Sequence, residues 1–186
     1  MPKARASVVP EAHRRHLLNS LGPLWRGSLL SGSAASLLST LLLVLRGRRE
    51  SGSGYAALNA VSHWLWGPSA YAVDARTWRH TAPGALIHHA SSLVWGVLFE
   101  LLLRQLRLRR AGAAAGPAGA AGGLTLAHVA ATAAAVTAVA AVTDLRLVPE
   151  RLSPGFENRL RPGSVALVYL AFGCGLLAVG AWQARR

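Results

Sequence analysis

The chain has 186 residues, of which 52% are hydrophobic and 15% are charged, and its net charge is +13. A soluble domain carries about 25% charged residues, so the composition argues against an ordinary soluble protein, and the length leaves no room for a separate catalytic unit. The basic residues are almost all arginines that bracket apolar stretches, which favours anionic lipid head groups over nucleic acid as their partner.

Residues 1–27 form a basic N-terminal region. Within it, residues 11–26 predict a short helix that lies on a membrane surface, because leucines recur on one face and histidines and arginines occupy the other. The charged stretch is long and no small-residue cleavage site follows the first apolar stretch. We therefore expect that stretch to be a retained membrane anchor.

The first predicted span, residues 28–45, contains no charged residue. Ser28, Gly32 and Ser36 recur every four residues and form a stripe of small side chains on one face. Such stripes let a second helix approach closely in lipid. The stripe predicts a helix-packing surface, and one hypothesis is that it joins two copies of the chain or a membrane protein partner.

Residues 55–73 follow as a broken apolar segment. The stretch 55–66 is too short to cross a bilayer as a helix, and its tryptophans suit the depth of the head groups. We predict an interfacial or shallow re-entrant helix that breaks at Gly67-Pro68. The alternative is a kinked full span.

Three further spans are predicted at residues 81–103, 124–143 and 164–182. Gly173 and Gly175 interrupt the last of these and offer close packing to another helix. An Ala/Gly-rich stretch, 111–123, connects two of the spans, and a charged loop with three prolines precedes the last. Residues 28–183 are thus expected to form one all-α transmembrane domain of four helices.

The distribution of basic residues predicts the orientation. With four spans, the side that holds the N-terminus carries eleven lysines and arginines against nine on the other side. The positive-inside rule then places the N-terminus in the cytoplasm. The excess of arginine, alanine and glycine is typical of a GC-rich bacterial genome, so we expect a multi-pass protein of the bacterial inner membrane.

Polar residues at membrane depth are costly and often functional. The main candidates are Asn59, His63, His88 and His89. Their positions along the predicted helices give them similar depths in the membrane. We therefore expect Asn59 and His63 to lie near either His88 or His89. Imidazoles can bind a metal, a haem or a proton. No Asp, Glu or Cys falls near these residues, so we expect no bound cofactor. A haem or a metal ion bound by the histidines is the alternative. The structural interpretation is that these histidines bind backbone carbonyls and serines between packed helices.

Span two carries two polar stripes, one through His89, Ser92 and Glu100 and another through His88, Ser91 and Trp95. Glu100 precedes Arg104 by one turn, which predicts a charged pair. Asp144 and Arg146 are expected to belong to a charged network that ties span three to the following loop. Phosphate-binding loops, metalloprotease motifs and nucleophile elbows are absent from the sequence.

Three strings carry a resemblance to other proteins: Asn59–Gly67 (NAVSHWLWG), Arg79–Thr81 (RHT) and Pro154–Glu157 (PGFE). With the layout of the four spans, they make the chain similar to small four-helix inner-membrane proteins of GC-rich bacteria. The resemblance implies fold and location. That group has no assigned activity, so no site residue follows from it.

The function expected from the sequence is that of a non-enzymatic structural or accessory membrane protein that works through helix packing. A haem- or metal-binding redox protein that uses the intramembrane histidines is the first alternative. The second is a small transporter or channel, with the break at Gly67-Pro68 and the polar stripes of span two along its path.

Overall fold

A computed structural model describes the backbone of residues 11–114 and 123–186, and the side chains within 22–113 and 123–186. This part of the chain consists of helices and loops and contains no strand. Four helical stretches are long and apolar enough to cross a membrane, which confirms the all-α, four-helix prediction. They are Gly22–Ser51, Trp78–Ala113, Leu126–Leu147 and Pro162–Ala184.

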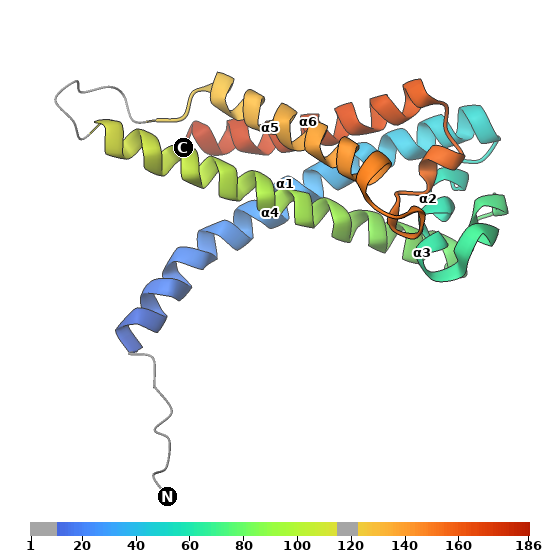
Figure 1. The fold of residues 1–186 in the computed structure, drawn as a ribbon, viewed down its shortest axis with the longest axis horizontal. Helices are drawn as coiled ribbons and strands as arrows, with labels where there is room; N and C mark the ends of the chain where they lie inside the picture. Colours follow the sequence, from blue (N-terminus) through green and yellow to red (C-terminus); the bar gives the residue numbers. More distant parts are fainter. Residues whose placement is uncertain (1–10, 115–122) are drawn as a thin grey trace, which may run out of the picture.

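Helix α1 (Glu11–Ser51) differs from the prediction at its start. Residues 11–26 are helical, but they continue into the first apolar stretch without the break that a separate surface helix requires. Gly27 packs closely against Glu100 and Gln183, so the junction already lies inside the bundle. Figure 1 shows the N-terminal part of α1 projecting away from the other helices. Residues 1–10 and 115–122, where the N-terminal tail and most of the Ala/Gly-rich connection were placed, lie outside the described residues.

Helix α1 packs between α4 (Trp78–Ala114) and α6 (Pro162–Ala184). A Cβ atom on Gly32 would lie 2.8 Å from the Cα atom of Leu93, and one on Gly175 would lie 2.4 Å from the Cα atom of Ala35. Both distances are too short for a side chain, so the three backbones approach closely. The small-residue stripe, including the buried Ser28 and Ser36, therefore serves packing within one chain.

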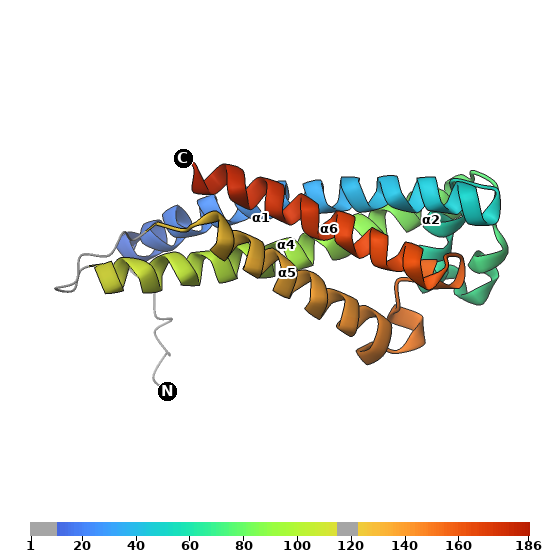
Figure 2. The same ribbon diagram turned by 90° about the horizontal axis from the view of Figure 1, so that it is seen from above.

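Helix α5 (Leu126–Val142) completes the bundle and contacts α6 more than α4. Its start is capped by Thr125 and His128, whose side chains each bond to the other's backbone N–H. Gly173 of α6 faces Thr137 of α5. Figure 2 shows that the C-terminal end of α5 diverges from the remaining helices.

A cap closes the end of the bundle at the right of Figure 1. We use this name for residues 52–77 and 143–161. The first segment holds α2 (Ala56–Val61), α3 (His63–Trp66) and η1 (Gly67–Ala72). All six residues of α2 are buried, because five of them are apolar and the sixth, Asn59, has hydrogen-bond partners inside the protein. The segment breaks at Gly67, as predicted, and also earlier, at Ser62.

Two contacts fasten the first cap segment to α4. Pro83 lacks an N–H group, so the carbonyl of Arg79, four residues earlier, has no helical partner. The indole N–H of Trp66 donates to that carbonyl at 2.7 Å. A Cβ atom on Gly84 would lie 2.1 Å from the carbonyl oxygen of Leu58, so the glycine allows α2 to lie against α4.

The second cap segment contains the turns η2 (Thr143–Leu147), η3 (Glu150–Leu152) and η4 (Phe156–Asn158). The indole N–H of Trp64 donates to the carbonyl of Ser153 at 2.8 Å, which joins the two segments. Gly155 has φ +84 and lies against the imidazole of His63, so both its conformation and its surroundings require glycine.

Candidate functional site

A cavity of about 310 Å³ lies between α4, α6 and the diverging end of α5, next to the cap. Most of its wall is apolar or aromatic and includes Trp64, Ile87, Trp95, Phe156, Val168 and Phe172. Its size lies within the range of small-molecule sites, which are typically apolar with a few convergent polar groups. It therefore has the general character of a ligand pocket.

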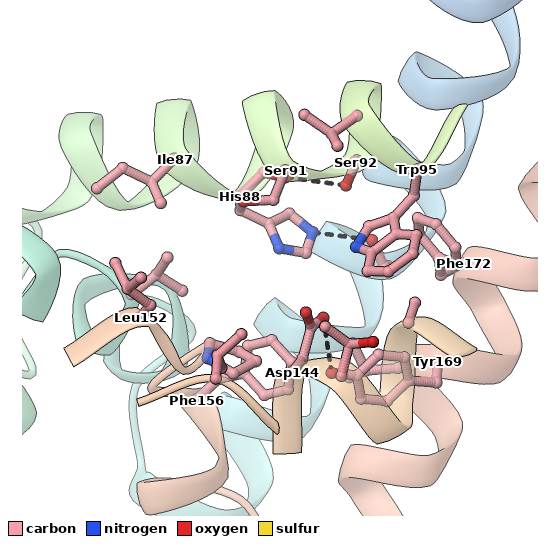
Figure 3. Close-up of a pocket in the computed structure, with 18 of the residues that line it drawn as sticks. Ile87, His88, Ser91, Ser92, Trp95, Asp144, Leu152, Phe156, Tyr169 and Phe172 are labelled. Atoms are coloured by element: carbon pink, nitrogen blue, oxygen red, sulfur yellow. Dashed lines mark hydrogen bonds between the residues drawn. The ribbon is translucent and has the colours of Figure 1, made fainter. Parts of the chain in front are cut away.

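The polar groups of the cavity come from opposite walls. Figure 3 shows the ring of His88 pointing down from α4, with Asp144 and Tyr169 facing it from below. Asp144 stands on η2, a π-helical turn in which the N–H of Val148 bonds to the carbonyl of Thr143 at 3.0 Å. Turns of this type occur frequently at functional sites.

His88 is fixed by α1. Its Nε2 atom lies 2.8 Å from the hydroxyl oxygen of Ser39. The Ser39 hydroxyl itself points at the backbone carbonyls of Ala35 and Ser36, at 2.8 Å and 3.1 Å. The carbonyl of His88 also accepts a hydrogen bond from Ser92, at 2.9 Å. These contacts orient the imidazole, while its Nδ1 atom has no hydrogen-bond partner among the described residues.

Asp144 has one hydrogen-bond partner in the described part of the chain. The hydroxyl of Tyr169, from α6, donates to its Oδ2 atom at 3.1 Å. The ring of Phe156 lies between the two walls, with its centroid 6.2 Å from that of Tyr169 and 6.4 Å from that of His88. Rings from the cap and α6 thus connect the two polar groups.

The cap is rich in carboxylates without basic partners. Ion pairs in the described residues involve two other acids, Glu50 with Arg46 and Asp74 with Arg159. Asp144, Glu150 and Glu157 form none, although the chain as a whole is strongly basic. Their influence reaches the cap surface, where burial raises the pKa of the Tyr71 phenol and the charges of Glu157 and Glu150 raise it further.

A second cavity, of about 570 Å³, lies on the other side of Tyr169, which lines both cavities. Two buried polar atoms without a partner in the described residues belong to residues that line it, Thr137 Oγ1 and Glu157 Oε2. Buried polar atoms are usually satisfied, and exceptions call for an explanation. Carboxylates therefore lie on both sides of the Tyr169 ring.

The structure does not bring the four residues of the predicted polar cluster together. The amide of Asn59 donates to the carbonyls of Val73 and Ala75, at 2.8 Å and 2.9 Å, and accepts from the Thr81 hydroxyl at 2.7 Å. Asn59 thus holds the loop before α4 in place. Its partners are backbone and hydroxyl groups within the cap and the start of α4.

His63 also makes structural contacts. The break at Ser62 turns its side chain toward the second cap segment, where Nδ1 lies 2.9 Å from the carbonyl of Ala60 and Nε2 lies 3.1 Å from that of Glu150. Asn59 and His63 lie on separate helices, because α2 ends at Val61. His88 lines the cavity, whereas the adjacent His89 does not.

The two predicted charged groups are not formed either. Glu100 accepts hydrogen bonds from Ser31 at 2.6 Å and from Gln183 at 3.0 Å, in place of the expected pair with Arg104. Ser31 and Gln183 belong to α1 and α6, so contacts across the bundle outcompete the pair along one helix. Asp144 faces the cavity while Arg146 is exposed, so no network joins them.

Sequence reasoning identified some of the cavity wall and missed the rest. The stripe of His88, Ser91 and Trp95 on span two does line it, but the break at Gly67-Pro68 does not. Tyr169 was overlooked, although a tyrosine within an apolar helix usually needs a hydrogen-bond partner. The phenol hydroxyl of Tyr169, inside an apolar run of the last span, was the available signal.

The described residues contain no group of three or more His, Cys, Asp and Glu side chains that could hold a metal ion. Comparison of the chain with protein-family models, curated proteins and solved structures finds no match. The cavity and its polar groups are therefore the basis for assigning a role.

Proposed function

We propose that this chain is a multi-pass membrane protein that binds a small lipophilic molecule in the cavity between α4, α5 and α6. The role is non-enzymatic, as the sequence led us to expect, but it rests on a ligand instead of on helix packing alone. The small-residue stripe of α1 is occupied by α4 and α6 of the same chain, so it offers little surface to a second copy.

One observation carries this proposal. The divergence of α5 leaves an apolar, aromatic space beside the closely packed helices α1, α4 and α6, and two polar groups face each other there from opposite walls (Figure 3). A gap of this kind costs packing energy, because its lining atoms lose van der Waals contacts. A bound molecule would restore those contacts.

The surroundings of the helices support a place in the membrane. Four helices have the length and hydropathy of spans. Arginines flank three of them at both ends and the span at Leu126–Leu147 at its C-terminal end, where anionic head groups would pair with them. We place the chain in a bacterial inner membrane with the N-terminus in the cytoplasm, on the arginine distribution described above.

The proposal is tested with a neutral probe, 1-(4-fluorophenyl)pentane, whose fluorine is observed by NMR in phosphatidylcholine nanodiscs. Wild-type protein should produce a bound signal that saturates at one probe per chain, beyond the partitioning measured in empty nanodiscs. Ala140 is buried on α5 and lines the cavity, so Ala140→Phe should fill the space and abolish that signal.

Ala138 provides the matched control, since it lies on the same helix and is exposed. Ala138→Phe adds the same side chain outside the cavity and should leave the bound signal unchanged. A bound signal that survives Ala140→Phe, or that is absent from the wild type, would show that the cavity is not a ligand site.

A further inference from the structure

The hydrogen bonds around His88 favour one tautomer of its ring, because a serine within a helix readily donates to a carbonyl of the preceding turn. The Ser39 hydroxyl lies within hydrogen-bond distance of the carbonyls of Ala35 and Ser36, and when its single hydrogen is donated to one of them, its oxygen accepts from the Nε2–H of His88. Neutral imidazole carries one N–H. In this tautomer the Nδ1 atom of His88 presents a lone pair to the cavity.

The opposite wall also presents acceptors. One carboxylate oxygen of Asp144 accepts from Tyr169, and an ionised carboxylate has no hydrogen to donate. No described basic side chain pairs with it. Because His88 and Asp144 both accept, a molecule held between them has to donate hydrogen bonds.

The charge of Asp144 points to a cation. A carboxylate in apolar surroundings is costly unless an opposite charge accompanies it. Aromatic rings line the same space, among them Trp64, Trp95 and Phe156, and the faces of such rings attract cations. Glu157, on the far side of Tyr169, adds further negative charge.

We infer that the cavity binds a lipophilic primary amine as its ammonium ion, with the N–H groups directed to Asp144 and to Nδ1 of His88. The apolar remainder of the ligand lies among the aromatic rings. This inference rests on the proposed function, because it specifies the chemistry of the molecule that the cavity holds.

The test compares probes that differ only in the head group. In 4-(4-fluorophenyl)butylammonium an ammonium group replaces the terminal methyl group of 1-(4-fluorophenyl)pentane, and in 5-(4-fluorophenyl)pentanoate a carboxylate takes that end. Binding is again followed by fluorine NMR in phosphatidylcholine nanodiscs, whose head groups carry no net charge. The ammonium probe should bind about tenfold or more tightly than the methyl probe, and the carboxylate probe should not bind.

Asp144→Asn removes the charge while keeping a side chain of the same shape. It should reduce the preference for ammonium over methyl to about threefold or less, while the methyl probe still binds, which shows that the variant is folded. Glu100→Gln is the control, because Glu100 is a buried carboxylate outside the cavity, and it should keep the full preference.

Each remaining outcome has a definite meaning. Equal binding of the ammonium and methyl probes to the wild type, or an unchanged preference in Asp144→Asn, overturns the amine inference and leaves the lipophilic cavity standing. Failure of both probes to bind overturns the proposed function as well. An N-trimethylated probe that binds as tightly as the primary ammonium overturns the hydrogen-bonding role of His88.

Discussion

Gly84 on α4 is the position where a single methyl group should most disturb the cap. Its Cβ atom would lie 2.1 Å from the carbonyl oxygen of Leu58, whereas ordinary contacts begin at 3.4 Å. Neither group is the free end of a side chain, so α2 as a whole must move away from α4. Val61 and Trp64, which follow in the chain and line the cavity, would move with it.

The expected cost of Gly84→Ala combines two effects. Overpacking a well-packed contact costs about 1–3 kcal/mol, and replacing glycine by alanine within a helix returns about 0.5–1 kcal/mol. We expect a net destabilisation of about 1–2 kcal/mol, together with weaker binding of the fluorinated probes. Unfolding by titration with sodium dodecyl sulfate, followed by circular dichroism, measures the first effect.

Gly163→Ala is the matched control, since Gly163 lies in the first turn of α6 with nothing within 4 Å of its Cβ position. It should retain or slightly raise stability, because only the helix propensity changes. If the two variants unfold at the same detergent fraction, the close approach of α2 to α4 does not hold in the protein and the reasoning fails.

Three further predictions concern the cap and the topology. Asn59→Leu leaves two carbonyls and a hydroxyl without their amide partner and should lower the free energy of unfolding by about 2–4 kcal/mol in the same assay. The control Asn158→Ala should lower it by well under half of that. Equal losses would count against the inferred role of Asn59. Trp66→Phe removes the donor to the carbonyl of Arg79 and should lower the free energy of unfolding by about 1 kcal/mol. The control Trp78→Phe, at a position 88% exposed, should have no comparable effect. If Trp78→Phe is the more destabilising change, the indole of Trp66 does not stabilise the carbonyl that Pro83 leaves without a helical partner. Green fluorescent protein fused to the C-terminus should fluoresce in a bacterial host, because the proposed orientation, with a cytoplasmic N-terminus and four spans, places the C-terminus in the cytoplasm; a dark but full-length fusion would overturn that orientation.

The sequence predicted the cap only in part. The break at Gly67-Pro68 follows from local chemistry, because proline and glycine disfavour a continuous helix wherever they occur. The earlier break at Ser62 has no such signal, and it arises where α2 meets α4 and the second cap segment. The direction of the His63 side chain depends on this second break, so the sequence did not reveal it.

Competition between hydrogen-bond partners explains why Glu100 does not pair with Arg104. Glu100 and Arg104 are spaced for a pair along one helix, which is worth only about 0.2–0.5 kcal/mol. Ser31 and Gln183 reach the same carboxylate from two other helices, and hydrogen bonds to a charged group are worth about 1.5–3 kcal/mol each. The preference for those partners becomes apparent only when the three helices are placed together.

Hydropathy alone determined that the chain has four apolar helices and nearly where each one lies, because the cost of burying a residue in an apolar medium is a local property that adds along the chain. Side-chain partnerships are not local in this sense. Ser39 meets His88, and Tyr169 meets Asp144, only because of the rotation of each helix about its axis and the divergence of α5. Close contacts at Gly32 and Gly175 set how α1, α4 and α6 face one another, so the tertiary structure decided where a cavity would form and which chemical groups would face it.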